Sequence, residues 1–319
     1  MKTNYEFRCL PKAACAIFFV SMGNRKGRLN DLFLTLNLAG KEFKMILVAG
    51  SKGMLGHDLL TLFGENARGV CREDMDITSP AAVRKVLLTL KPHVVINAMA
   101  YTDVDGSEKR PEPAFRVNGE AVKHLAEVTA EIGAKLVHIS SDYVFDGTKG
   151  SPYLEEDPTS PLSIYGKSKL SGEENARLNP DHLVVRTQWL YGLHGRNFVE
   201  TMLRLAQEKK ELDIVNDQIG SPTWTVSLAR ALKALIEKDC RGIYHAVNSG
   251  SCSWFDFAAA IFAEKGVDIR LQPIASRELD RPAPRPLFSV LDCGKLLRDT
   301  GLNMEGWRDA LIKYLKERD

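Results

Sequence analysis

The sequence predicts an α/β protein built on a doubly wound parallel sheet, with a smaller C-terminal lobe. Three observations favour this class. From Met45 onward, short β-branched runs alternate with longer amphipathic segments, as in βαβ units. A glycine-rich turn follows the first apolar run. After about residue 215, the alternation gives way to proline-marked and aromatic segments that still contain helical periods.

The individual elements follow from the spacing of apolar residues. Continuous apolar runs predict buried strands at 45–50, 93–99, 135–141 and 182–191. Apolar residues at helical spacing predict helices at 54–63, 80–90, 114–132, 225–237, 254–265 and 306–317. We therefore expect a first domain over 45–215 and a smaller lobe over 216–319, interleaved with it.

Residues 1–44 have a different character. They hold eight Lys/Arg against three Asp/Glu. Their apolar run at 13–20 is too short to span a bilayer and makes a poor signal-peptide core. The segment "GKEFK" before Met45 could be encoded by a ribosome-binding sequence. We expect 1–44 to be a non-native or disordered extension. Mass spectrometry of the natively expressed protein would test this, because an N-terminus upstream of Met45 would contradict it.

Composition excludes several classes of function. The chain has 319 residues, of which 44% are hydrophobic and 26% charged, as in a globular protein. Residues 45–319 hold 35 basic and 38 acidic residues, so neither a nucleic acid nor a membrane is an expected partner. Six scattered cysteines show no zinc-type spacing, which favours a reducing, cytoplasmic setting and no assigned metal.

The glycine turn carries the first functional signal. In "GSKGMLG", Gly50, Gly53 and Gly56 stand between the first strand and the first helix. Glycine permits a tight turn and a close approach of the backbone to a pyrophosphate, and the helix N-terminus adds N–H donors. The alternative is a plain tight turn, but the position is typical of the Rossmann dinucleotide-binding unit.

The end of the second strand bears on the choice of cofactor. An acidic residue there binds the adenosine ribose and repels a 2′-phosphate, but this sequence has Cys71 and Arg72. Arg72 could pair with a 2′-phosphate, which favours NADPH over NADH. Glu73 and Asp74 follow directly, so a solvated charged loop is an equally good interpretation of Arg72.

The second functional signal is "SIYGKSKL", where Lys169 follows Tyr165 by one helical turn. Such a pair occurs often by chance, but Ser141 closes a predicted strand 24 residues upstream, where ligands of parallel sheets bind. Reduction of a ketone needs a proton donor, and a lysine ammonium one turn away would lower the pKa of a tyrosine. Lys167 should face elsewhere.

These motifs resemble the extended short-chain dehydrogenase/reductases that act on nucleotide sugars. "GSKGMLG", "SSDYVFDG" and "YGKSK" carry that resemblance. "INAMAYTDVDGSE", "RTQWLYG", "NDQIGSPT" and "RPLFSVLD" make residues 45–319 similar to the dTDP-4-dehydrorhamnose reductase family. This implies NAD(P)H-dependent reduction of a C4 keto group on a dTDP-sugar, the last step of dTDP-rhamnose biosynthesis.

The resemblance also implies roles by position. Tyr165 would donate the proton, Lys169 would assist it and anchor the cofactor ribose, and Ser141 would bind the carbonyl oxygen. Further cofactor contacts would come from the turn and from two later strand ends, at Gly50, Gly53, Met54, Leu55, Gly56, Arg72, Asp76, Ile77, Ala100, Tyr101 and Thr102. Substrate contacts would come from Ser141, Asp142, Trp189 and Arg285. Trp189 could equally be a core aromatic residue.

Some positions depart from the family pattern. Met99 stands where alanine is usual, and Phe288 replaces an asparagine-like residue, which puts details of the contact near Arg285 in doubt. Some family members bind Mg²⁺ at a dimer contact, and Asp58 lies near that position, but its other ligands cannot be assigned from the sequence. The resemblance allows a homodimer.

Two other functions stay open at this stage. The first is another nucleotide-sugar reductase or an epimerase, and an epimerase would retain NAD through purification. The second is a non-catalytic regulatory subunit of the same fold. The complete set of Ser141, Tyr165 and Lys169 argues against the regulatory subunit.

Overall fold

The computed structural model describes residues 45–319, which belong to one compact unit. The predicted extension over 1–44 lies outside the described residues.

A six-stranded parallel sheet forms the centre, in the order β10-β5-β4-β3-β1-β2. Because β1 lies between β2 and β3, the chain winds outward from β1 in both directions, and the predicted doubly wound sheet is confirmed. The strands are β1 (Ile46–Ala49), β2 (Ala67–Val70), β3 (Val94–Asn97), β4 (Lys135–Ser141), β5 (His182–Thr187) and β10 (Gly242–His245).

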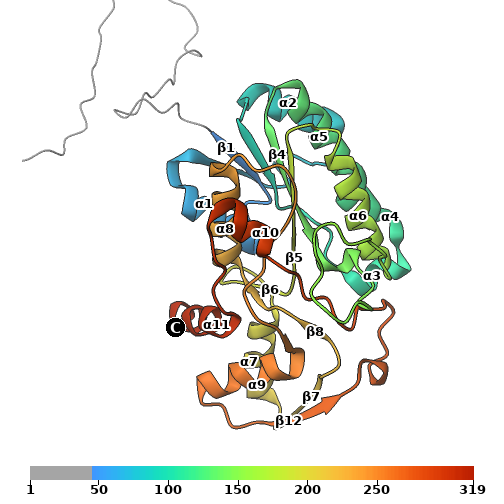
Figure 1. The fold of residues 1–319 in the computed structure, drawn as a ribbon, viewed down its shortest axis with the longest axis vertical. Helices are drawn as coiled ribbons and strands as arrows, with labels where there is room; N and C mark the ends of the chain where they lie inside the picture. The colour runs from blue at the N-terminus through green and yellow to red at the C-terminus, as the bar shows by residue number, and fades with distance from the viewer. Residues whose placement is uncertain (1–44) are drawn as a thin grey trace, which may run out of the picture. The chain divides into compact units, whose positions relative to one another are not determined.

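Helices cover both faces of this sheet (Figure 1). Side chains alternate along β1, so Ile46 and Val48 pack on one side and Leu47 and Ala49 on the other. The first side is covered by α1 (Met54–Phe63), α8 (Thr225–Glu237) and α10 (Gly294–Thr300). The second side is covered by α2 (Pro80–Leu90), α5 (Ala121–Glu131) and α6 (Ile164–Ala176).

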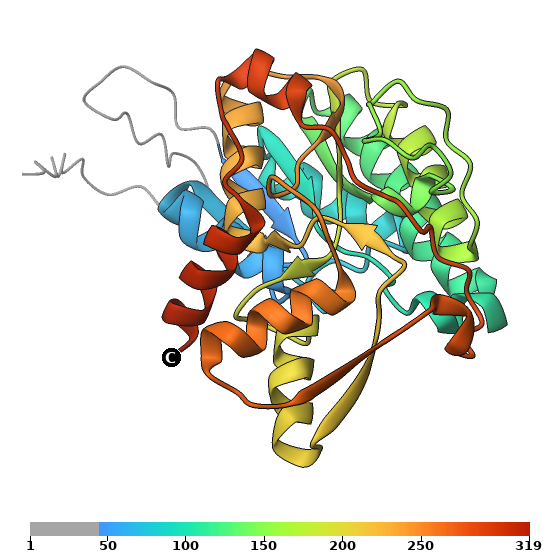
Figure 2. The ribbon, with the colours of Figure 1, turned by 60° about the horizontal axis from the view of Figure 1, so that its bottom comes forward.

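A second hydrophobic core lies beyond the carboxyl edge of the sheet (Figure 2). It is formed by α7 (Phe198–Glu208), α9 (Trp254–Lys265) and α11 (Trp307–Arg318). Three strand pairs accompany these helices: β6 (Leu190–Tyr191) with β9 (Thr223–Trp224), β7 (Glu211–Val215) with β12 (Arg270–Ile274), and β8 (Ile219–Gly220) with β11 (Cys252–Ser253). The chain after residue 215 also returns to the central sheet as β10 and α8; a domain boundary at 215/216 stays a prediction.

The predicted helix at 114–132 is the element that differs most. It consists of α4 (Pro111–Phe115), a π-helical turn at Arg116–Glu120, and α5, and it follows the short α3 (Val104–Lys109). Strand β10 was not predicted, because its sequence, Gly-Ile-Tyr-His, contains no continuous apolar run.

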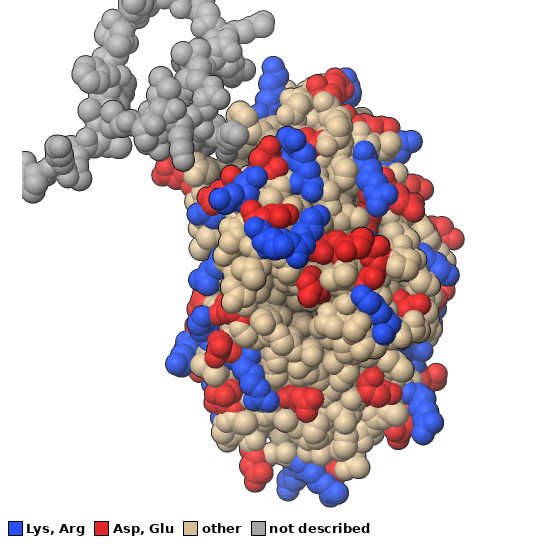
Figure 3. All heavy atoms as spheres, viewed as in Figure 1, with Lys and Arg blue, Asp and Glu red and all other residues tan. Residues whose placement is uncertain are grey.

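The surface shows no strong segregation of charge on the face in Figure 3, where Lys/Arg and Asp/Glu are interspersed. Within residues 45–319, no helix is long and apolar enough to cross a membrane.

Candidate active site

Two adjoining cavities lie at the carboxyl edge of β1, β3 and β4. The Tyr165 cavity, of about 570 Å³, is lined by residues from α1, β4, α6 and the segment around Trp189. The Arg72 cavity, of about 530 Å³, is lined by residues that follow β1, β2 and β3. The two share Gly53, Ala98, Met99 and Ala100, so they form one continuous cleft at the switch point of the sheet.

Two positions of the glycine turn require glycine, because a side chain there would collide with the backbone. Gly50 has a φ of +94°, and a Cβ there would lie 2.9 Å from the carbonyl carbon of Ala98. A Cβ on Gly56 would lie 2.1 Å from the carbonyl oxygen of Gly50. The turn therefore folds back tightly and opens the N-terminus of α1 into the cleft, a cradle that fits a dinucleotide pyrophosphate.

All the sequence-predicted cofactor residues line this cleft. Arg72, Asp76, Ile77 and Tyr101 line the Arg72 cavity, as does Gly50. The Tyr165 cavity is lined by Met54, Leu55, Gly56, Thr102, Tyr165 and Lys169, and Gly53 and Ala100 line both cavities.

The acidic residues near Arg72 are each held by another group. Lys52 Nζ lies 3.3 Å from Glu73, the Asp74 carboxylate accepts from the Cys71 N–H, and Asp76 accepts from Thr78. The Thr78 hydrogen bonds hold the pKa of Asp76 below its ordinary value. Arg72 forms no ion pair with any residue of 45–319. Its charge therefore remains available to a ligand.

The start of α6 positions Tyr165. The Ser163 hydroxyl caps the helix by accepting a hydrogen bond from the Gly166 N–H, 3.1 Å away. A Cβ on Gly166 would lie 2.3 Å from the carbonyl oxygen of Tyr143, so glycine lets the helix begin against that residue. The Tyr165 and Tyr143 rings pack edge to face with centroids 5.4 Å apart.

Lys169 lies one turn further along the same face of α6. It is 2% exposed, and its Nζ donates to the carbonyl oxygen of Ile139 at 2.6 Å. Burial lowers its pKa to about 8, opposed by the negative charge of Glu173. Lys167 is exposed, as predicted for a residue on another face of the helix.

Ser141 ends β4 beside Asp142. Its hydroxyl donates to the Asp142 carboxylate at 2.8 Å and accepts from the Tyr143 N–H at 3.2 Å. The sequence predicted that Lys169 would lower the pKa of Tyr165, but burial, reinforced by the charge of Asp142, raises that pKa well above its ordinary value. Burial of the phenol thus dominates, and Tyr165 retains its proton at neutral pH.

The remaining substrate candidates have different surroundings. Asp142 lines the Tyr165 cavity, and burial raises its pKa to about 6. Trp189 lines the same cavity with a φ of +48°, and its ring stacks on Trp254 at 3.6 Å. Arg285 lines neither cavity; its guanidinium binds the Asp105 carboxylate at 2.8 and 3.0 Å.

Sequence reasoning missed Asn118, which lies in the π-helical turn and is buried. Its side-chain amide accepts from the Tyr101 N–H and donates to the Tyr101 carbonyl and the Ser168 hydroxyl, at 2.8 to 3.0 Å. It therefore ties the strand end beside the cofactor cradle to the helix that carries Tyr165. The available signal was a polar residue on the apolar face of the predicted helix, three residues after Phe115 and four before Val122. Turns of π-helix are common at functional sites.

The parallel sheet, the glycine cradle, and the serine, tyrosine and lysine at its carboxyl edge define the class of extended short-chain dehydrogenase/reductases. Residues 44–319 match the family described as "RmlD substrate binding domain". The chain belongs to this family.

Individual relatives cover most of the chain. It is 43% identical to the spore coat polysaccharide biosynthesis protein SpsK of Bacillus subtilis, over 86% of this chain and 97% of that protein. It is 42% identical to a dTDP-4-dehydrorhamnose reductase of Streptomyces griseus, over 84% and 91%. The crystal structure of a Bacillus anthracis dTDP-4-dehydrorhamnose reductase in complex with NADP is 36% identical, with a TM-score of 0.83 over 86% and 99%.

Proposed function

We propose that the protein reduces the C4 keto group of dTDP-4-dehydro-L-rhamnose to dTDP-L-rhamnose with a reduced nicotinamide dinucleotide. The observation that carries this proposal is the meeting of Ser141, Tyr165 and Lys169 in a cavity that continues into the glycine cradle. The names of the Streptomyces and Bacillus anthracis relatives support the same reaction. The SpsK relative supports a use of the product in cell-surface polysaccharide.

The proposal gives each of these residues a task in the reaction. When bound, the dinucleotide supplies a hydride to the carbonyl carbon. The Ser141 hydroxyl, which donates to the Asp142 carboxylate here, turns to donate its one hydrogen bond to the carbonyl oxygen. Tyr165 gives that oxygen its proton as negative charge develops there. The phenol of Tyr165 is protonated at neutral pH, so the proton is in place before the hydride is transferred. Lys169 keeps two N–H donors beyond its bond to Ile139, and these fit the ribose hydroxyls.

The same proposal includes a preference for NADPH over NADH. Arg72 lines the cavity without an ion pair in the described chain, and Lys52 and Arg116 line it as well. These three cations outnumber the two carboxylates of the same cavity wall, Glu73 and Asp76, which favours a 2′-phosphate over a free ribose hydroxyl. A cytoplasmic location and a homodimer stay predictions.

The decisive experiment offers enzymatically generated dTDP-4-dehydro-L-rhamnose with NADPH or NADH and follows the loss of cofactor absorbance. We expect turnover with NADPH and formation of dTDP-L-rhamnose. Folded protein that consumes neither cofactor would contradict the proposal. Tightly held NAD after purification, with no need for external reductant, would instead indicate an epimerase.

Replacing the proton donor separates chemistry from binding. Tyr165→Phe removes the proton donor, so kcat should fall by about 10²- to 10⁴-fold. The dissociation constant for NADPH should stay within about threefold of the wild-type value, a change in binding free energy of under 1 kcal/mol. Steady-state kinetics and calorimetric titration measure the two quantities. The surface variant Lys167→Ala, on another face of α6, is the matched control and should leave both unchanged.

A further inference from the structure

Two residues outside the Tyr165 cavity contact the indole of Trp189 at the wall of that cavity. Trp189 lies just after β5, and its backbone has a φ of +48°. A bulky residue rarely adopts this conformation, which persists only where the surrounding structure fixes it. The carbonyl oxygen of Trp189 accepts a hydrogen bond from the Thr223 N–H at 3.1 Å, which holds the backbone. The position of the ring depends on its own neighbours.

Trp254, the first residue of α9, is one of these neighbours. Its ring stacks on the Trp189 ring, with centroids 3.6 Å apart and an angle of 11° between the two planes. Trp254 is itself held in place. Its indole N–H donates to the side-chain oxygen of Gln218 at 3.2 Å, and its ring packs on that of Phe198, with centroids 4.6 Å apart. One face of the Trp189 indole is therefore covered by a fixed ring.

Gly220 is the other neighbour of the indole. A Cβ at this position would lie 2.6 Å from Cε2 and 2.8 Å from Cζ2 of Trp189. It would also lie 2.4 Å from the side-chain oxygen of Gln188, which is buried and accepts a hydrogen bond from the Ser221 N–H at 2.8 Å. Gly220 pairs with Cys252 in the β8–β11 ladder, and β11 leads directly into Trp254. One short strand pair thus places both neighbours of the ring.

We propose that Trp254 and Gly220 are positioning residues, which fix the Trp189 indole as a flat wall against which the sugar nucleotide binds. This inference rests on the proposed function, because Trp189 is a predicted contact of that substrate. Trp189 lines the same cavity as Ser141 and Tyr165, so a shift of the indole changes the space in which the sugar nucleotide binds. Neither Trp254 nor Gly220 lines either cavity. Their replacement should therefore weaken substrate binding and leave proton transfer and cofactor binding intact.

Steady-state kinetics of Trp254→Leu in the full chain tests the proposal. We expect the KM for dTDP-4-dehydro-L-rhamnose to rise by about 3- to 10-fold, because the stacked pair is lost. The kcat and the dissociation constant for NADPH should stay within about twofold of the wild-type values. Trp254→Phe keeps an aromatic ring and should restore most of the lost affinity. Phe255→Leu, at the next residue of α9, is the matched control and should leave KM unchanged, since Phe255 lines neither cavity.

Gly220→Ala perturbs the same indole without changing Trp254. Its methyl group would press on the Trp189 ring, so KM for the sugar nucleotide should rise while kcat stays near the wild-type value. Because the backbone of β8 is extended and the strand pair is kept, this variant tests the proposal even if Trp254→Leu folds poorly.

Two measurements that need no turnover complete the test. The stacked indoles should give an exciton couplet in the circular dichroism spectrum, which Trp254→Leu should abolish and Phe255→Leu should retain. Calorimetric titration with dTDP-L-rhamnose in the presence of NADP⁺ should show the same weakening, of about 3- to 10-fold, in Trp254→Leu.

The outcomes separate this inference from the proposed function. Wild-type affinity for dTDP-L-rhamnose in both Trp254→Leu and Gly220→Ala would overturn the inference alone. Equal losses of substrate affinity, kcat and cofactor binding would also overturn it, because they indicate a general loss of structure. A wild-type protein that does not bind dTDP-L-rhamnose would overturn the proposed function and this inference with it.

Discussion

At the scale of single residues, burial shifts the pKa values of the ionisable groups in the site. Burial raises the pKa values of Tyr165 and Asp142, and it lowers the pKa of Lys169 to about 8. The proximity of Tyr165 and Lys169 was predictable from their four-residue spacing, but the dominance of burial was not, because burial depends on the rest of the fold.

The buried carboxyl of Asp142 predicts a stability that depends on pH. Its pKa is about 6 in the folded protein against an ordinary value of 3.8. Between these values the folded state binds a proton that the unfolded state lacks, so this group's contribution is fully present below about pH 4 and is lost as the pH rises through 6. The loss is about 3 kcal/mol, at 1.36 kcal/mol per pKa unit.

Asp142→Asn should remove this contribution to the pH profile. We expect the free energy of unfolding of the wild type, relative to Asp142→Asn, to fall by about 2 kcal/mol of that total from pH 4 to pH 7 in urea titrations. Asp146→Asn is the control, because Thr148 holds the pKa of Asp146 below 3.8 and its titration lies below that window. Parallel profiles for wild type and Asp142→Asn would disprove the argument.

At the scale of elements, the glycine turn predicts a contrast within seven residues. Gly56→Ala would drive a methyl group to 2.1 Å from a backbone oxygen, whereas a Cβ on Gly53 meets that oxygen at 3.3 Å with an ordinary φ of −81°. Gly56→Ala should therefore lower the free energy of unfolding by about 1–3 kcal/mol, and Gly53→Ala by under about 0.5 kcal/mol. Denaturant titration of both variants measures these changes. Equal losses of the free energy of unfolding would contradict this explanation of the turn.

Two arginine–glutamate pairs between elements differ mainly in burial. Arg186 and Glu173, which join β5 to α6 behind Lys169, are 2% and 1% exposed. Arg84 and Glu131, which join α2 to α5, are 53% and 45% exposed. Both pairs are bidentate, with distances of 2.6 to 2.9 Å.

Loss of the glutamate charge should therefore lower the free energy of unfolding by different amounts in the two pairs. Glu173→Gln leaves a buried guanidinium uncompensated and should lower the free energy of unfolding by about 3–5 kcal/mol. Glu131→Gln should cost under about 1 kcal/mol, because water solvates the arginine that remains. Unfolding of the two variants in guanidinium chloride measures both losses. An equal loss of the free energy of unfolding in Glu131→Gln and Glu173→Gln would contradict this prediction.

Most elements could be predicted from periodicity because each is a local pattern. The helices at 54–63, 80–90, 225–237 and 254–265 match α1, α2, α8 and α9 residue for residue. The π-helical turn could not be predicted, since its cause lies outside it: Asn118 bonds to Tyr101 and Ser168, 17 and 50 residues away.

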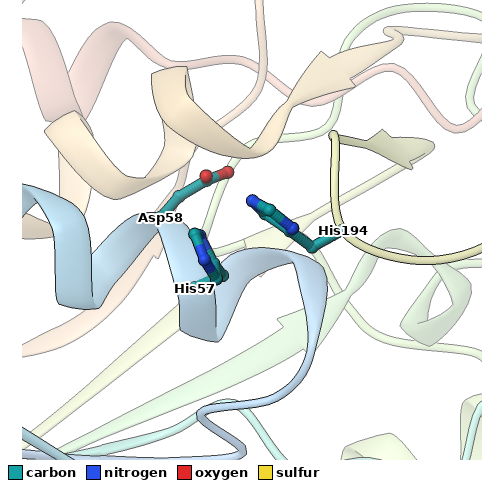
Figure 4. A group of neighbouring side chains, drawn as sticks. All are labelled: His57, Asp58 and His194. Atoms are coloured by element: carbon teal, nitrogen blue, oxygen red, sulfur yellow. The ribbon is translucent and has the colours of Figure 1, made fainter. Parts of the chain in front are cut away.

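At the scale of the whole molecule, the order of the strands brings distant segments of the chain together. Parallel strands place the turns after β1, β3 and β4 at one edge, so residues near 53, 100 and 141 become neighbours. This follows from the predicted fold class. The pairing of Arg285 with Asp105, 180 residues apart, does not, because no local pattern encodes it. The meeting of His57 with His194, whose rings lie side by side in Figure 4, was unpredictable for the same reason.

Global unfolding reports on the cofactor preference because a ligand that binds only the folded state stabilises the whole molecule. At a concentration of 100 times its dissociation constant, NADPH should add about 2.7 kcal/mol. For a chain of this size, 1 kcal/mol corresponds to roughly 2–4 °C in Tm. If Arg72 pairs with the 2′-phosphate, NADPH should bind about tenfold more tightly than NADH, a difference of about 1.4 kcal/mol.

Thermal melts with equal concentrations of the two cofactors should therefore differ by about 3–5 °C in favour of NADPH. Arg72→Gln should remove most of that difference, because Arg72 lies just after β2 and, like Arg116 in the same cavity wall, forms no ion pair within the described chain. Arg68→Gln is the matched control: Arg68 is exposed on β2 but does not line the cavity, and its loss should leave the difference intact. If both variants melt alike, or if NADH stabilises the wild type as much as NADPH does, the phosphate is recognised elsewhere, and Arg72 belongs only to the solvated loop that its acidic neighbours first suggested.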